Sequence, residues 1–451
     1  MTYRGRRLMT GFSAVGLCVF LAFGPYLGPV RFEQVGIYLS LVALAFAGSL
    51  GKLTLHRSTM AVIGLWLFIL ALATANTMAA MQARETAITV PAFTLLDLPS
   101  AIGLKNLFGG LDNFLLPMAV IAIVGIACQR VPEDQRQRLL DAGVLAILIC
   151  LCLNSLFALS IALQPERLLP VASYFWPSGG GPSVALAALA QQRIGGAFNQ
   201  PGEAGSAYSL GLILWMYRYR NGVGRPWAQG VMAPLLLLGA ILCSSKIVFL
   251  AGFPLALIYY FLHSETRGVT RRYRRTVFLV IAACFAMAIP AALVVLSNGN
   301  YLTQFSLFMD SLRSGSLLEA LTGGRVGGGS SESSVLTFYF DEIMKKSPLF
   351  GLGFGSLSAY DSAYIHILAL AGLVGVAAYL AMLAIVAYRF MAPSEPARLG
   401  LMIIVMVVLA GTGMPVLVQN RVGSLVIFCL ALAWKLTPPL PQRSPVSEAV
   451  V

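Results

Sequence analysis

Long apolar stretches recur from one end of the chain to the other, and short polar segments separate them. Stretches of about 18–25 residues have the length at which an α-helix crosses the hydrocarbon core of a bilayer. A segment in that core must satisfy its own backbone hydrogen bonds, so a helix is expected. Twelve runs qualify, the sixth and seventh being short: 8–28, 33–50, 59–80, 111–128, 139–162, 203–218, 229–243, 247–263, 277–297, 362–389, 399–418 and 421–437. The pattern predicts an all-α polytopic membrane protein with about 12 transmembrane helices.

The composition agrees with this fold class. Of the 451 residues, 58% are hydrophobic and 11% are charged, and the mean hydropathy is +0.80. A soluble domain carries roughly 25% charged residues, so a soluble enzyme, a disordered protein and a disulfide scaffold are excluded. The seven cysteines form no CxxC pair and lie within or at the ends of apolar runs, as small core side chains do. Arg4, Arg6 and Arg7 precede the first run as in a signal peptide, but no A-x-A-like cleavage site follows.

The basic charge predicts the orientation of the chain. Lys and Arg number 31 against 18 acids, a formal net charge of +13. With the N-terminus inside, 20 of the 31 cations fall in the inner segments, although the outer segments hold far more residues. Cytoplasmic loops keep the excess of Lys and Arg, so both termini are expected to be cytoplasmic. The positive charge is then a consequence of topology, and nucleic acid is not an expected partner.

One outer segment is much longer than the others. It divides the chain into helices 1–9 (1–297), an extracytoplasmic loop (298–361), helices 10–12 (362–437) and a proline-rich tail (438–451) expected to be disordered. A loop of that length is uncommon unless it is functional or disordered, and this one is too rich in aromatics for disorder. It is expected to contain a short helix over 333–346, followed by a glycine-rich turn.

Three cations on the outer side are candidates for binding an anionic headgroup. Arg193 begins the glycine-containing stretch 193–205 before the sixth run, and an Arg can grip phosphate oxygens bidentately. Lys246 lies in a polar break between the seventh and eighth runs, and Arg325 stands among glycines whose backbone amides can surround a phosphate. The alternatives are side chains that snorkel to water and a flexible linker. Glu203, at the start of the sixth run, is either functional or a helix-capping acid.

The start of the tenth run holds the candidate general bases. Asp361 and His366 could each deprotonate a hydroxyl acceptor. His56 and His263 are expected on the inner side, so His366 is the one imidazole available to outer-face chemistry. Asp361 shares a helix face with Tyr364, whereas His366 shares another face with Ser362. The alternative for His366 is a polar side chain bonded inside the bundle. The sequence has no nucleotide-binding motif and no carboxylate pair with metal spacing, so no cofactor and no metal are expected.

Six motifs in order and spacing resemble the O-antigen ligase/polymerase superfamily, the Wzy-like and WaaL-like membrane glycosyltransferases of the GT-C type. The resemblance covers roughly 190–390, and its motifs are Arg193–Pro201, Ser245-Lys246, Gly324-Arg325, Ser347–Gly355, Asp361–Ile365 and Gly372–Gly375.

The resemblance implies an enzyme of the bacterial inner membrane with its active site on the periplasmic face. Its donor would be an undecaprenyl-diphosphate-linked oligosaccharide, whose diphosphate Arg193 and Arg325 contact. The reaction would be inverting and metal-independent, with a chain-length regulator and a flippase as candidate partners. The sequence departs from the pattern of this superfamily at two positions. Lys246 stands where an Arg is common, and Asp361 stands where the ligase branch has His; His366 lies four positions too late to replace it.

The Asp variant resembles the polymerase branch, which favours polymerisation of repeat units into O-antigen or exopolysaccharide. Two alternatives stay open: a ligase that transfers a finished glycan to lipid A-core, and a twelve-span transporter. The loop motif typical of such transporters after the second span is absent from 51–57.

Overall fold

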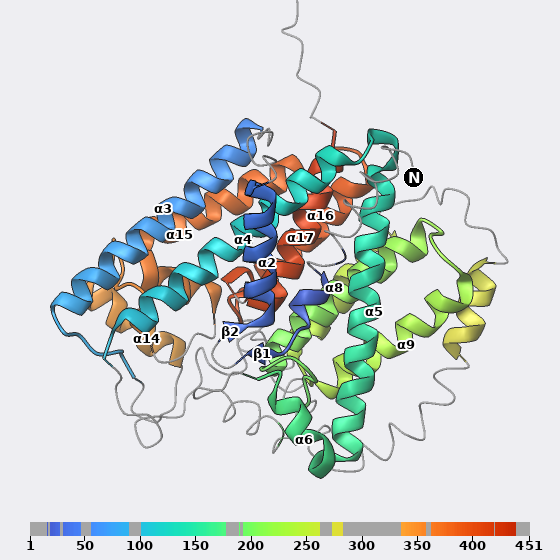
Figure 1. Ribbon diagram of the computed structural model, residues 1–451, viewed down its shortest axis with the longest axis horizontal. Coiled ribbons are helices and arrows are strands. Elements are labelled where there is room, and N and C mark those ends of the chain that lie inside the picture. The colour runs from blue at the N-terminus through green and yellow to red at the C-terminus, as the bar shows by residue number, and fades with distance from the viewer. Residues whose placement is uncertain are drawn as a thin grey trace, which may run out of the picture.

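The structure is a computed structural model that describes residues 16, 19–27, 30–46, 56–89, 101–176, 189, 193–261, 273–282, 335–357, 362–418 and 420–438. These residues are mostly helical, as the apolar pattern predicts (Figure 1). The labelled helices are α2 (Phe32–Phe46), α3 (Arg57–Gln82), α4 (Leu104–Arg130), η3 (Glu133–Gln135), α5 (Arg136–Leu163), α6 (Pro165–Ser173), α8 (Pro201–Arg220), α9 (Pro226–Leu242), the π-helical η4 (Val248–Gly252), α10 (Phe253–Phe261), α14 (Val335–Lys346), α15 (Ala363–Arg389), α16 (Glu395–Ala410), η5 (Val416–Val418) and α17 (Asn420–Leu436).

Four of the helices that the structure describes are long and apolar enough to cross a membrane. They are α3, α4, the continuous stretch Glu133–Leu163 that contains α5, and α15. Shorter apolar helices are α2, α9 and Val248–Phe261. The membrane-protein class follows from these helices, because their apolar residues extend over the length of a bilayer core.

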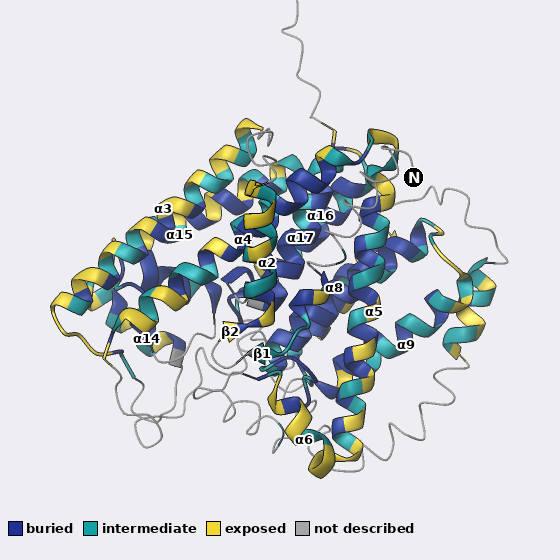
Figure 2. Ribbon diagram, viewed as in Figure 1, coloured by how far each residue is buried: buried dark blue, intermediate teal, exposed yellow. Residues whose placement is uncertain are grey.

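Long helices pack in pairs around a buried centre. α3 packs against α15, α4 packs against α17, and α5 packs against α9. The helix α8 sits among α9, α10, α5 and α16, and nearly all of its residues are buried (Figure 2). A surface helix of a soluble protein would have a polar face, whereas the exposed residues of α2 and α3 include Phe46, Met60 and Leu67.

α4 begins at Leu104, seven residues before the expected start at 111. Two other expected helix ends are also wrong, and in both cases a turn residue explains the difference. The helical residues described in the first run end at Ala22, and Gly24-Pro25 lead into a two-residue antiparallel pair, β1 (Tyr26–Leu27) with β2 (Val30–Arg31). The eleventh run was expected to continue to 418. Instead α16 ends at Ala410, the glycine-containing turn 411–413 follows, and η5 forms a separate short helix.

The short helix expected over 333–346 is present as α14, Val335–Lys346. Of the predicted loop 298–361, the structure describes 335–357, and of the expected tail it describes Pro438. We call the end of the bundle that carries β1, β2, α6 and α14 the outer end, because the charge distribution predicts that it faces away from the cytoplasm. The opposite end, where α15 and α17 finish, is the inner end (Figure 1).

Candidate functional site

The loop Arg193–Pro201 is held in one conformation by a buried asparagine. The Asn154 side chain of α5 donates to the carbonyl oxygen of Gly195 at 3.1 Å, and its Oδ1 accepts the N–H of Ala197 at 2.8 Å. Gly196, between them, has a φ of +70°, and a Cβ there would lie 2.5 Å from Asn154 Oδ1. A residue with a side chain would therefore be strained and would clash. The glycines of this motif shape the loop around α5.

This loop is joined to the polar break between the seventh and eighth runs. The N–H of Ile194 donates to the carbonyl oxygen of Leu242 at 2.8 Å, one residue before the Cys243–Lys246 turn. Further along, Gly205 packs so closely on Ser245 that a Cβ would lie 2.1 Å from the Ser245 hydroxyl. Two motifs that are about fifty residues apart in the sequence thus form one structural unit at the outer end.

Arg421, at the start of α17, ties two further segments to this unit. Only 3% of the residue is exposed. Its guanidinium donates to the carbonyl oxygens of Ala197, of Gly24 at 3.1 Å and of Phe175 at 2.9 Å. It also lies over the Tyr26 ring, 5.3 Å from the ring centroid. A buried guanidinium needs such partners, because leaving its donors unsatisfied is costly.

Glu203 lies in the first turn of α8, where Arg421 and Arg31 act on its carboxylate. The residue is 8% exposed, and its Oε2 accepts the N–H of Asn199 at 3.2 Å. A carboxylate at this position also faces the positive end of the helix dipole. Glu203 therefore holds the loop against α8. Of the two interpretations offered by the sequence, this is the helix-capping acid.

A second charged group extends the site toward α2 and α4. Arg31 forms ion pairs with Glu33 at 3.3 Å and with Asp112 of α4 at 3.5 Å. Asp112 also accepts hydrogen bonds from Gln34 and from the Tyr38 hydroxyl, the latter at 2.8 Å. Charged side chains in a membrane-protein interior are expensive and usually paired. We define the outer-end cluster as Arg31, Glu33, Asp112, Glu203 and Arg421, together with the Arg193–Pro201 loop.

A small recess of about 260 Å³ lies beside the loop. Arg193, Asn199 and Phe198 line it from the loop, and Trp176 and Ile161 line it from the other side. The Trp176 indole N–H donates to the carbonyl oxygen of Gly196 at 3.3 Å, so this wall is fixed to the loop as well. Arg193 and Lys246 are both partly buried, and they stand on the two segments that the Ile194–Leu242 hydrogen bond joins.

The start of α15 connects to α8 through the turn that follows α16. The Ser362 hydroxyl donates to the carbonyl oxygen of Gly411 at 3.2 Å, and His366, one turn into α15, is 8% exposed. In the same turn region Met414 Sδ accepts the Ser206 hydroxyl of α8 at 3.7 Å. His366 therefore lies near the outer end, one turn beyond the Ser362–Gly411 contact. Arg325 and Asp361 lie outside the described residues.

The glycine-rich segment Ser347–Gly355 has a structural partner. α15 is kinked at Gly372, which has a φ of 64° and a ψ of −163°, and a Cβ there would lie 2.2 Å from the backbone of Leu349. The N–H of Leu373 donates to the carbonyl oxygen of Pro348 at 2.9 Å. The motifs at 347–355 and 372–375 are thus two halves of one backbone contact, and no phosphate is needed to explain their glycines.

Several members of the site carry no local signal in the sequence. The predicted topology leaves 11 cations on the outer side: Arg31, Arg84, Lys105, Arg167, Arg193, Lys246, Arg313, Arg325, Lys345, Lys346 and Arg421. Nothing in the local sequence marks Arg31 and Arg421 as the buried members of this set. Asn154 is easier to recognise in the sequence than Arg31 or Arg421, because a polar side chain in the middle of an apolar run needs a partner. Among the described residues no group of His, Cys, Asp and Glu is arranged to hold a metal ion.

The chain was compared with known protein families and with curated proteins. No family model matches the sequence, and no curated protein matches it either.

Proposed function

We propose that the chain is a membrane glycosyltransferase that polymerises undecaprenyl-diphosphate-linked oligosaccharide repeat units into O-antigen or exopolysaccharide. The observation that carries the proposal is the junction of two motifs at the outer end. The Arg193–Pro201 loop is hydrogen-bonded to the segment before Lys246 and is fixed by Arg421. Two candidate diphosphate-binding cations therefore stand on neighbouring, rigidly held segments.

The electrostatic task of such an enzyme fits this arrangement. When the glycosyl bond breaks, negative charge develops on the departing undecaprenyl diphosphate. Cations held in advance stabilise that charge without having to move. Arg193 supplies a bidentate donor and Lys246 a point charge. In this proposal Arg325, from the long outer loop, completes the diphosphate site.

The acceptor hydroxyl must lose a proton as it attacks the sugar carbon from the side opposite the diphosphate. Asp361 is the proposed base, and His366 is the other candidate near the start of α15. Glu203 is the least suited of the three, because its carboxylate accepts the Asn199 N–H and is occupied in holding the loop. It is proposed as a positioning residue.

The finer topology belongs to the same proposal. Twelve spans with both termini in the cytoplasm place the outer-end cluster at the periplasmic face of a bacterial inner membrane. The long outer loop, between the ninth and tenth spans, then lies on that face too. A lipid-linked donor is required there, because no nucleotide is available outside the cytoplasm.

A deletion strain tests the proposal and its alternatives, with surface polysaccharide separated on gels. Lipid A-core capped with single repeats is the result expected for a polymerase. Loss of all capped lipid A would replace the polymerase with the ligase, and an unchanged ladder would contradict both and leave the transporter. Complementation with Arg193→Ala is expected to leave single repeats. Arg167→Ala, an exposed outer cation on α6, is the matched control and is expected to restore the ladder.

A further inference from the structure

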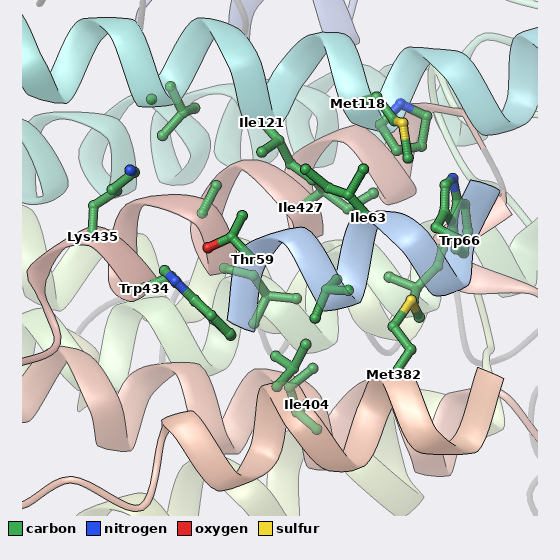
Figure 3. Close-up of a pocket in the computed structure, with 18 of the residues that line it drawn as sticks. Thr59, Ile63, Trp66, Met118, Ile121, Met382, Ile404, Ile427, Trp434 and Lys435 are labelled. Carbon is green, nitrogen blue, oxygen red and sulfur yellow. The ribbon is translucent and has the colours of Figure 1, made fainter. Parts of the chain in front are cut away.

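A larger hollow lies in the inner half of the bundle, away from the outer-end cluster. It comprises about 940 Å³ of space, part of it open to the surroundings, and is walled by α3, α4, α15 and α17, with single residues from α16 and η5 (Figure 3). Apart from Thr59, Lys435 and two tryptophans, its lining consists of aliphatic side chains, methionines, a proline and a glycine. From Thr59 to Trp66 the α3 wall is about 10 Å long at the rise of an α-helix. The hollow therefore has the shape and chemistry of a site for part of a hydrocarbon chain.

Polarity is confined to the inner end of this hollow. Thr59, Trp434 and Lys435 lie together at one end, whereas Trp66, Met118 and Met382 lie toward the other (Figure 3). The Thr59 hydroxyl oxygen is buried and has no hydrogen-bond partner among the described residues. The hydroxyl can donate a hydrogen bond to a polar group of a ligand that lies beside it.

The hollow opens to the side of the bundle. α3 packs mainly along α15, and α4 packs mainly along α17, and residues of all four helices line the hollow. Thr59, Ile63, Met118 and Ala431 are only partly buried although they line the hollow. In a membrane the molecules at this opening are lipids, and a lipid chain is the occupant that can enter without leaving an apolar environment.

Cations stand at the inner ends of the helices that wall the hollow. Each of its four main helices has a cation in the terminal turn on that side: Arg57, Arg130, Arg389 and Lys435. The fifth helix, α16, begins there with Glu395, whose carboxylate is bound by Arg398 at 2.9 Å. Arg389 also lies over the Trp434 ring, 5.8 Å from its centroid. The charge complement of this end is an anionic headgroup.

We propose that this hollow binds one acyl chain of an anionic phospholipid from the inner leaflet, with the phosphate near Lys435 and the glycerol ester near Thr59. Lipid tails are as apolar as the lining side chains, so moving a chain from the bilayer into the hollow gives little selectivity. Selectivity must come from the headgroup. The choice of the inner leaflet rests on the proposed topology. The site is separate from the proposed donor site, and binding is measured without any glycosyl transfer, so failure of lipid binding and failure of the transfer reaction are distinguishable.

The test measures lipid retained by the purified full chain with native mass spectrometry. The protein is incubated with phosphatidylglycerol or with phosphatidylcholine of the same acyl composition. The wild-type chain is expected to retain one phosphatidylglycerol, and about fivefold less phosphatidylcholine, as one nearby cation implies. Lys435→Glu is expected to remove this preference. Arg138→Glu, an exposed inner cation on α5 outside the lining, is the matched control and is expected to keep it.

A second pair of variants tests the hollow itself. Ala431→Trp places a large side chain in the lining and is expected to lower retention of both lipids at least about tenfold, since the space of the chain is then occupied. Leu67→Phe enlarges an exposed residue of α3 outside the lining and is expected to change nothing. An unchanged thermal midpoint establishes that each variant is folded. Equal retention of the two lipids by the wild type, unchanged retention by Ala431→Trp, or recovery of a polyprenyl lipid instead of a phospholipid from cell membranes would overturn the proposal.

Discussion

The two ends of the bundle are built on different principles. At the outer end, individual polar contacts fix the backbone: Arg421 binds three carbonyl oxygens, and Asn154 bonds to both sides of Gly196. In the inner half, the large hollow is lined by apolar side chains whose contacts have no direction. Directional contacts hold a site in one geometry, as a catalytic site requires. Non-directional contacts tolerate exchange of similar side chains, as a lipid-binding surface can.

The contrast predicts that Arg421 is the most sensitive position. Arg421→Met keeps an apolar chain of similar length but removes the donor from the buried carbonyl oxygen of Ala197, at about 1–3 kcal/mol, and from the partly buried carbonyl oxygens of Gly24 and Phe175. Polymer formation is expected to fall to background and the thermal midpoint of the purified protein to drop.

Arg421→Lys separates folding from function at this position. It keeps the charge but has no planar fork, so the midpoint is expected to recover in part, with polymer formation still well below wild type. Wild-type polymer levels in both variants would show that the guanidinium contacts are unimportant.

A smaller but clear effect is expected from Gly372→Ala, in the outer half of α15. The new Cβ must adopt a φ of 64° and meets the Leu349 backbone. Strain in the left-handed region costs on the order of 1–3 kcal/mol, and the segment 347–357 is expected to detach. Limited proteolysis should then cut near this segment faster than in wild type. Gly64→Ala on α3, where a Cβ meets nothing within 4 Å, is the control, and equal cleavage rates in the two variants would contradict the docking.

The smallest effect is expected in the inner half. Met382→Leu exchanges one apolar lining side chain for another of similar volume, a change that usually costs less than about 1.5 kcal/mol. Polymer formation is expected to equal that of the wild type on gels, with a midpoint shift of at most a few degrees. A loss of activity comparable to that of Arg421→Lys would remove the distinction between the two ends.

The sequence predicts the helices better than it predicts the site. Hydropathy is a local property, so the runs at 59–80 and 362–389 correspond to α3 and α15 within two residues. Hydropathy does not predict the kink at Gly372, because the apolar pattern continues through the kink. The run 8–28 was expected to be helical to its end, but Tyr26 and Leu27 form a short strand that pairs with Val30 and Arg31.

The site depends on contacts between distant parts of the chain. The loop motif at Arg193 was recognisable from its residues, and so was the polar break at Lys246. Their junction rests on a backbone hydrogen bond from Ile194 to Leu242, which no side-chain pattern encodes. Arg421 stands at the edge of an apolar run, where a snorkelling side chain is the ordinary expectation. Its burial depends on three segments that converge only in the folded protein.

The most direct test of the proposed function is the rate of polymer formation by the purified protein in vesicles supplied with an undecaprenyl-diphosphate-linked repeat unit. The wild type is expected to extend the donor into a ladder. Arg193→Ala is expected to lower the rate by about 10²–10³-fold, the usual effect of removing one donor to a developing anion. Arg167→Ala should retain the wild-type rate. Equal rates for Arg193→Ala and the wild type, with both proteins folded, would contradict the account of the outer-end cluster as a diphosphate site.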